Sequence, residues 1–131
     1  MKYLILTLLS LFTFAEVPGL KAGDAVPSIT LKSISGKTYQ LDKLDKKTAI
    51  IFYRGSWCPY CMKQLQSVQE DVMNKIGSDS QIIAVSVDRA MVAKKMKAKN
   101  KFSFAVISDP KAKSLAAFKI INKVDDKLVN F

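Results

Sequence analysis

The chain has 131 residues, of which 49% are hydrophobic and 24% are charged. This balance is ordinary for a single globular domain, and it excludes disordered, collagen-like and coiled-coil classes. The formal net charge is +10, and there is no histidine. A Ser-His-Asp triad and a His-ligated metal are therefore excluded. The two cysteines cannot complete a four-ligand zinc site unless two chains share the metal.

The amino-terminal segment is typical of a secretory signal peptide. Lys2 precedes an uncharged stretch, residues 4–15, that is rich in Leu and Phe. This stretch is shorter than the roughly 20 residues that a membrane-spanning helix needs, and it ends in small residues, as signal peptides do. We predict removal of residues 1–15, with cleavage after Ala15 or as late as Ala22, and a periplasmic or secreted product. A buried helix or a retained membrane anchor is the alternative.

The first predicted elements of the domain are a β-hairpin and a buried strand. Residues 29–31 alternate apolar and polar side chains, Ser35-Gly36-Lys37 is a turn sequence, and residues 38–41 can return as the second arm. Residues 48–53 form a β-prone apolar run that is too short for a helix. Such a run predicts a strand covered on both faces.

Helices and strands alternate along the rest of the chain. Apolar residues recur three or four positions apart on one predicted helix face that Gly77 closes, namely Cys61, Leu65, Val68, Val72 and Ile76. The pattern next predicts a strand at 81–87, a basic helix at 89–101, a strand at 102–107, an Asp109-Pro110 turn, a helix at 111–121 and the start of one more helix within 122–131. This alternation predicts a parallel sheet flanked by helices.

Two cysteines three positions apart form the candidate site. Cys58 and Cys61 fall in the first turn of the helix that follows residues 48–53, at the carboxyl end of a strand, where open α/β sheets place their sites. Unpaired N–H groups at a helix N-terminus favour an anion, so we expect a lowered pKa for Cys58 and assign it as the nucleophile. Cys61, one turn further, is predicted to be shielded and to act as the resolving thiol. A structural disulfide and half of a shared metal site are the alternatives.

Four neighbours of the pair are predicted to support it, namely Arg54, Trp57, Pro59 and Tyr60. Arg54 can add positive charge if it folds back, and Pro59 suits the first helical turn, where its missing N–H costs nothing. Trp57 is expected to shield one side of the sulfur pair. The spacing lets the two sulfurs bond without backbone movement, and export would place them in an oxidising compartment. Cys58–Cys61 is therefore the predicted redox-active disulfide.

The segment around the cysteines resembles a known family. Residues 52–61, Phe-Tyr-Arg-Gly-Ser-Trp-Cys-Pro-Tyr-Cys, resemble the active-site segment of thioredoxin-fold proteins, and most of all the peroxiredoxin-like branch of the alkyl hydroperoxide reductase/thiol-specific antioxidant family. Residues 23–27 and 107–110 resemble that family's opening motif and its later Ser-Asp-Pro turn. The resemblance covers about residues 23–121 and implies an α/β fold, a thioredoxin-like three-layer α/β/α sandwich with an N-terminal β-hairpin. The Pro59-Tyr60 dipeptide between the cysteines is also common in glutaredoxins.

The sequence departs from these families at several functional positions. Gly55 stands where typical peroxiredoxins carry a Thr three residues before the reactive cysteine. No Arg follows Arg89, although an Arg from late in the chain completes the peroxide pocket of those enzymes. Phe52 stands where thioredoxins place a buried Asp as a proton acceptor. Peroxide reduction is therefore less favoured, and proton handling must come from water, from Lys side chains or from elsewhere.

Thioredoxin folds also face the cysteine pair with a cis-proline loop, which a β-hairpin and a last helix follow. None of the prolines of this chain can take that place: Pro18, Pro27, Pro59 and Pro110. We therefore expect the thioredoxin-like domain of residues 23–131 to be a truncated, frameshifted or partial product, with the C-terminal hairpin and helix missing. One edge of the strand 48–53 would then stay unpaired. A domain completed by a second chain is the alternative.

Together these features predict an exported thiol–disulfide oxidoreductase that needs no cofactor or metal. Its expected partners are client protein thiols or disulfides and an upstream redox partner. The alternatives are a thiol peroxidase that uses Cys58 and an inactive fragment in which the cysteines only staple a helix turn. The lysine-rich run 94–101 has no interleaved aromatic residue, which favours a solvated helix face over a nucleic-acid site. Asp88 and Asp109 are expected to form caps or turns, and membrane contact is expected only through the signal peptide.

Overall fold

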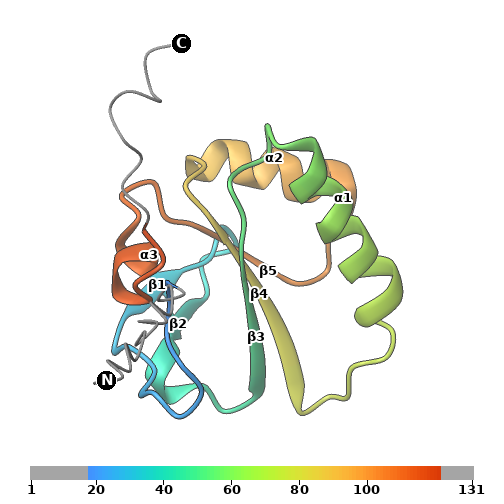
Figure 1. Ribbon diagram of the computed structural model, residues 1–131. Helices are drawn as coiled ribbons and strands as arrows, with labels where there is room; N and C mark the ends of the chain where they lie inside the picture. Colours follow the sequence, from blue (N-terminus) through green and yellow to red (C-terminus); the bar gives the residue numbers. More distant parts are fainter. Residues whose placement is uncertain (1–17, 122–131) are drawn as a thin grey trace, which may run out of the picture.

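The computed structural model describes residues 18–121 (Figure 1). The predicted signal peptide, residues 1–15, and the predicted start of a last helix within 122–131 lie outside this range. Between residues 18 and 121, no helix is both long and apolar enough to cross a membrane.

The predicted N-terminal β-hairpin is present. Strands β1 (Thr30–Lys32) and β2 (Thr38–Gln40) pair antiparallel, and a short 3₁₀ helix, η1 (Leu41–Lys43), follows. The hairpin is joined to the rest of the fold just after β1, where the backbone N–H of Ile34 donates to the carbonyl of Val106 at 3.0 Å. The hairpin is therefore held against the last strand of the main sheet.

The main sheet is parallel, as the alternation of helices and strands predicts. Its strands are β3 (Lys47–Phe52), β4 (Ser80–Ser86) and β5 (Ala105–Ser108), in the order β3-β4-β5. The central strand β4 is almost entirely buried. The prediction that β3 is covered on both faces is wrong, because Lys47 and Ala49 are exposed and the other residues of the strand are only half-buried. Within residues 18–121, β3 pairs only with β4, so its outer edge has no partner strand.

The first long helix is not continuous. Helix α1 (Pro59–Ser67) passes into a π-helical turn, η2 (Val68–Val72), so the prediction of a single α-helical face as far as Ile76 is wrong in part. A π-helical turn inserts extra backbone and rotates the positions that follow it. Leu65 is fully buried before the turn, whereas Val72 at its end is 38% exposed.

The two later helices differ in how closely they match their predicted lengths. Helix α2 (Ala90–Asn100) agrees with the prediction, but α3 (Lys113–Ala117) is much shorter than the predicted 111–121. Left-handed residues stand at both ends of α3, since Ala112 has φ +52° and Lys119 has φ +58°. The predicted turn at Asp109 is present, and its carboxylate accepts a hydrogen bond from the backbone N–H of Ser114 at 2.7 Å.

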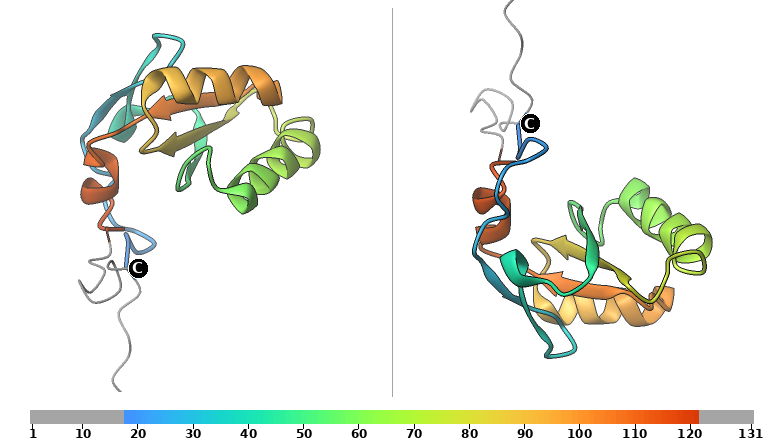
Figure 2. Two further views of the ribbon diagram at one scale, coloured as in Figure 1. Left: turned by 90° about the horizontal axis from the view of Figure 1, so that it is seen from above. Right: turned by 90° about the horizontal axis from the view of Figure 1, so that it is seen from below.

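Two hydrophobic clusters form the core, one on each face of the main sheet. On one face, α1 and α2 pack against β4 and β5, and Phe102 and Phe104 stack there with ring centroids 4.9 Å apart. These two residues precede β5, which therefore starts later than predicted. On the other face, the hairpin and η1 pack against β4 and β5 (Figure 2). The ring centroids of Phe52 and Phe118, which follows α3, are 5.2 Å apart on this face.

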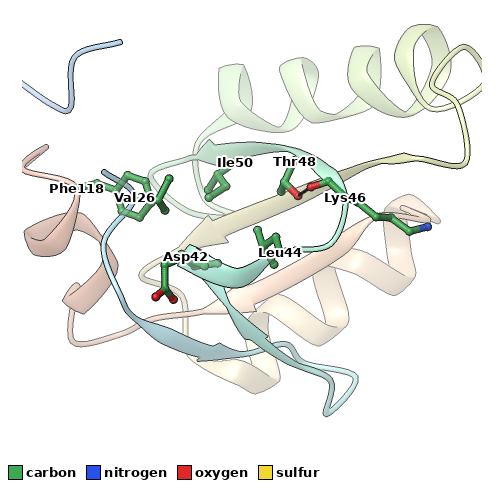
Figure 3. Close-up of a pocket in the computed structure, with 8 residues that line it drawn as sticks. Val26, Asp42, Leu44, Lys46, Thr48, Ile50 and Phe118 are labelled. Carbon is green, nitrogen blue, oxygen red and sulfur yellow. Dashed lines mark hydrogen bonds between the residues drawn. The ribbon is translucent and has the colours of Figure 1, made fainter. Parts of the chain in front are cut away.

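The face of β3 that meets η1 borders a hollow of about 460 Å³ (Figure 3). Its lining is Val26, Leu41, Asp42, Leu44, Lys46, Thr48, Ile50 and Phe118. The lining includes neither cysteine, so this hollow is separate from the candidate redox site.

The lysine-rich helix α2 is a largely solvated face with one exception. Lys97 is half-buried, and its ammonium group donates to the carbonyl of Phe104 at 2.6 Å. Desolvation lowers the pKa of Lys97. The other lysines between Lys94 and Lys101 are exposed, which agrees with the prediction for this run.

Candidate active site

The candidate site starts where β3 ends. The backbone N–H of Tyr53 still donates to Val85 of β4 at 3.0 Å, and the chain then turns away from the sheet at Gly55, which has φ +152°. The backbone N–H of Cys58 donates to the carbonyl of Gly55 at 3.1 Å and closes the turn. This turn delivers Cys58 to the start of α1.

Cys58 is the N-cap residue of α1, and Pro59 is the first helical residue, as the sequence predicts. The Cys58 sulfur accepts a hydrogen bond from the backbone N–H of Cys61 at 3.3 Å. The thiol of Cys61 and this N–H lower the pKa of Cys58 most, and the charge of Arg54 lowers it further against the opposing effect of desolvation. The site therefore favours the thiolate at Cys58, which is the reactive form of cysteine.

The burial of the two sulfurs differs from the prediction. Both thiols are free, but Cys58 is only 5% exposed, whereas Cys61 is half-buried. The expectation that Cys61 is the more shielded thiol is wrong, because the cap hydrogen bond turns the Cys58 side chain back over the first helical turn. Cys61 does pack against the core cluster between the sheet and α1, as its place on the apolar face predicts.

Arg54 folds back toward the site and lies against the exposed ring of Trp57. The guanidinium of Arg54 lies 4.6 Å from the centre of the Trp57 ring, a cation–π arrangement that holds the charge near Cys58. Trp57 is 61% exposed and Tyr60 is 84% exposed. The shielding of the sulfurs by Trp57 and the catalytic roles of both cysteines stay predictions.

Asp88 belongs to the site, although the sequence alone indicates only a cap or a turn at this position. Its carboxylate accepts hydrogen bonds from the backbone N–H of Ser56 at 2.8 Å and from the Ser86 hydroxyl at 3.2 Å. Its backbone carbonyl accepts a hydrogen bond from Ser108 at 2.6 Å. Asp88 therefore ties the turn before Cys58 to the carboxyl ends of β4 and β5. Its position directly after a buried strand is the signal that could have identified it.

Replacing Arg54 should slow the reaction of Cys58 with a thiolate-specific reagent. In Arg54→Gln the pKa of Cys58 rises, because one of the groups that lowers it is removed. Alkylation by iodoacetamide below the ordinary pKa of a thiol should slow, and the difference should shrink at higher pH. Lys75→Gln, which removes the same charge from an exposed position well beyond α1, is the matched control. Equal rates in the two variants would show that Arg54 does not act on Cys58.

The site has few donors for a metal ion. Within residues 18–121, no three His, Cys, Asp or Glu side chains gather closely enough to hold a metal.

A parallel sheet with an N-terminal hairpin, and a helix that begins directly after the first strand of that sheet with the sequence Cys-Pro-Tyr-Cys, are features of a thioredoxin-like fold. A solved structure of peroxiredoxin Q from Xanthomonas campestris is similar, with a TM-score of 0.67 and 23% identity over 78% of this chain and 65% of that one. DsbF from Mycobacterium tuberculosis has a TM-score of 0.63 at 17% identity, over 76% of this chain and 75% of that one. This likeness confirms the thioredoxin-like fold predicted from the resemblance.

The family is established by sequence. The model of the AhpC/TSA family matches residues 22–128, and the chain belongs to this family. Peroxiredoxin bcp1 of Schizosaccharomyces pombe is 31% identical over 94 residues, which are 70% of this chain and 48% of that protein. The thiol-disulfide oxidoreductase ResA of Bacillus subtilis is 25% identical over 80 residues, or 61% of this chain and 45% of that protein. The chain thus spans about half the length of these curated relatives.

Proposed function

We propose that this protein is an exported thiol–disulfide oxidoreductase that acts through Cys58 and Cys61. In the reducing direction, the Cys58 thiolate attacks a client disulfide, forms a mixed disulfide and releases one client thiolate. The Cys61 thiolate then attacks the Cys58 sulfur, forms the Cys58–Cys61 disulfide and releases the second client thiolate. The client is reduced by two electrons, the enzyme is oxidised by two, and an upstream dithiol restores the enzyme. In the opposite direction every step reverses.

The observation that carries this proposal is the cap geometry of the cysteine pair. The Cys58 sulfur accepts the Cys61 N–H at 3.3 Å at the start of α1, so the attacking thiolate and its resolving partner are adjacent. A helix N-terminus favours an anion, and the Cys61 thiol and the charge of Arg54 also lower the pKa of Cys58. This geometry supports Cys58 as the residue that attacks the client disulfide and Cys61 as the residue that attacks the mixed disulfide.

The surroundings of Cys58 support a protein as the client. An open cleft of about 470 Å³ lies beside the site and is lined by apolar and aromatic residues together with Arg54, namely Phe52, Tyr53, Arg54, Trp57, Val87, Leu115 and Ile120. Exposed aromatic residues such as Trp57 and Tyr60 are typical of surfaces that contact other proteins. A peptide segment on either side of a disulfide could rest on this surface while its sulfur meets Cys58.

Export is part of the proposal and rests on residues 1–15. An oxidising compartment outside the cytoplasm is where a client disulfide would persist long enough to be exchanged. Expression with the native leader, followed by N-terminal sequencing of the exported protein, should give a start after Ala15 or by Ala22. A product that keeps Met1 would contradict this part of the proposal.

A thiol peroxidase that uses Cys58 is the second candidate, and the similarity to peroxiredoxin bcp1 favours it. In that reaction the Cys58 thiolate would attack a peroxide oxygen and become a sulfenic acid as the O–O bond breaks. The leaving hydroxide or alkoxide would take a proton from solvent to give water or an alcohol. Gly55, which stands where typical peroxiredoxins carry a Thr, counts against it. Stopped-flow oxidation by hydrogen peroxide discriminates between the candidates, because a rate no better than that of a free thiol excludes the peroxidase.

Reduction of insulin by dithiothreitol tests the preferred candidate. We expect the reduced protein to accelerate the reaction, since Cys58 can exchange with the insulin disulfides and Cys61 can release it. The appearance of precipitated insulin B chain gives the rate. Insulin reduced at the rate of dithiothreitol alone would contradict the proposed activity.

A further inference from the structure

A groove lies between α1 and α2, next to the candidate redox site. Its volume is about 480 Å³, and residues of both helices line it. It includes Ser56, two positions before Cys58, and Met62 on the first turns of α1. The backbone N–H of Met62 donates to the carbonyl of Cys58 at 3.1 Å. The groove therefore begins at the helix turn that carries the reactive cysteine.

The floor of the groove is apolar and adaptable. Met62 is half-buried, Met96 is buried, and Val92 is exposed beside them. Methionine side chains are flexible and polarisable, so they fit apolar partners of differing shape. Further along, the side-chain amide of Gln66 on α1 donates to the side-chain oxygen of Asn100 on α2 at 3.2 Å and joins the two helices. The floor suits an apolar side chain of a bound peptide.

Two lysines of α2 line the same groove. Lys95 and Lys99 are both exposed and lie four positions apart, which places them on the same face of the helix. Within residues 18–121, neither ammonium group forms an ion pair or a hydrogen bond, and no Asp or Glu lines the groove. Like charges at this spacing repel each other, so carboxylates of a partner would be attracted by both.

Other exposed lysines of α2 and its C-cap lie on a different side. Lys94 and Lys101 line a separate hollow of about 370 Å³ together with Ile34, which follows β1. The positive charge of this helix is therefore divided between two faces. Of these two faces, the one with Lys95 and Lys99 borders the cysteine site.

We propose that this groove docks an acidic segment of the client protein beside the cysteine that is exchanged. The carboxylates of the segment pair with Lys95 and Lys99, and an apolar side chain between them rests on Met62 and Met96. Docking holds the client sulfur at Cys58 and raises the rate of attack, and the exchange chemistry itself is unchanged. The inference rests on the proposed function, since it names the class of client for the same site.

The length of the groove sets the spacing of the acidic residues. From Cys58 to Gln66 the axis of α1 rises by about 12 Å, and an extended peptide covers this distance with about four residues. Successive side chains of an extended peptide point to opposite sides. Acidic residues two and four positions from the client cysteine, with an apolar residue between them, therefore fit the lysines and the apolar floor.

Short peptides of matched length test this preference. The sequences are Cys-Gly-Glu-Leu-Glu, Cys-Gly-Lys-Leu-Lys and Cys-Gly-Glu-Ser-Glu, and each cysteine is carried as a mixed disulfide with thionitrobenzoate. Attack of the Cys58 thiolate on the peptide sulfur forms the enzyme–peptide disulfide and releases the coloured nitrobenzoate thiolate, whose absorbance gives the rate. The rate of each peptide with mercaptoethanol, an uncharged thiol, corrects for its own reactivity.

We expect the wild type to react roughly ten times faster with the Glu-Leu-Glu peptide than with the Lys-Leu-Lys peptide at low ionic strength, and added salt should reduce this ratio. The Glu-Ser-Glu peptide should react more slowly than the Glu-Leu-Glu peptide, because it lacks the apolar side chain. Lys95→Gln/Lys99→Gln should lower the ratio by roughly threefold or more. Lys94→Gln/Lys101→Gln removes the same charge from the other face and should keep the ratio of the wild type.

Several results would overturn the docking groove. Equal rates for the acidic and the basic peptide would do so, and equal rates for the Leu and Ser peptides would show attraction without docking. An equal loss of preference in the two paired variants would mean that the overall charge of α2 is enough. A single-stranded DNA oligonucleotide that binds through Lys95 and Lys99, with no preference among the peptides, would assign the groove to nucleic acid instead.

The proposed function has a separate readout in the same experiment. The wild type should exchange with dithiodipyridine, a small uncharged disulfide, faster than a free thiol does. Exchange no faster than that of a free thiol would count against the oxidoreductase. Rapid exchange without any preference among the peptides would overturn the groove and leave the proposed function standing.

Discussion

Cys58→Ser will abolish the acceleration of insulin reduction, whereas Cys61→Ser will stop after the first step and accumulate a mixed disulfide with the client. The difference follows from the order of the two attacks. Cys58 has the lowered pKa and attacks first, and Cys61 is needed only to release the client. Loss of a nucleophile removes the covalent route altogether, so the catalysed rate in Cys58→Ser should fall to that of dithiothreitol alone.

The mixed disulfide of Cys61→Ser can be observed directly. Non-reducing electrophoresis after incubation with a disulfide-bonded client should show a band of the combined mass, and the band should disappear on reduction. The two variants control each other, because each removes one sulfur from the same turn of α1 and keeps the other. Trapping by Cys58→Ser instead of Cys61→Ser would reverse the assigned roles.

Gly55→Ala will destabilise the fold and disturb the site more than any other glycine replacement in the described chain. A Cβ at this position would lie 2.5 Å from Nε1 of Trp57 and 2.9 Å from a carboxylate oxygen of Asp88, and φ is +152°. The Trp57 ring can move because it is exposed, but Asp88 is buried and holds the Ser56 N–H. Strained backbone of this kind costs on the order of 1–3 kcal/mol, and we expect the free energy of unfolding to fall by about 2–3 kcal/mol.

The measurement is urea unfolding of the reduced proteins, together with the rate of Cys58 alkylation. Gly36→Ala is the matched control, because Gly36 in the hairpin turn has φ +92° but a Cβ there meets nothing within 4 Å. That variant should show backbone strain alone, at about 1 kcal/mol, with normal alkylation. Equal destabilisation of the two variants would mean that the contacts with Trp57 and Asp88 do not matter.

Local signals are enough to predict the cysteine site. Proline is favoured at the first position of a helix, so Pro59 indicates that the helix begins there and that Cys58 is its N-cap residue. The Ser35-Gly36-Lys37 turn likewise locates the hairpin. Features of this kind depend on residues that are neighbours in the sequence, so their pattern is visible there.

Features that depend on distant residues could not be predicted. Asp88 meets Ser56 across 32 positions of the chain, and only the pairing of β3 with β4 brings them together. The exposure of β3 follows from its place at the outer edge of the described sheet, which its apolar sequence does not reveal. The apolar residues around the π-helical turn at Val68–Val72 are spaced as they would be in an ordinary α-helix. The sequence therefore carries no signal that Val72 is rotated away from the buried face.

Ultraviolet titration of the thiolates in the reduced protein tests the central assignment most directly. The absorbance of the wild type should rise in two steps, the first with a pKa below the ordinary thiol value, and the first step alone should be missing in Cys58→Ser. A single rise at the usual thiol pKa, or an early step that survives in Cys58→Ser and vanishes in Cys61→Ser, would contradict the account.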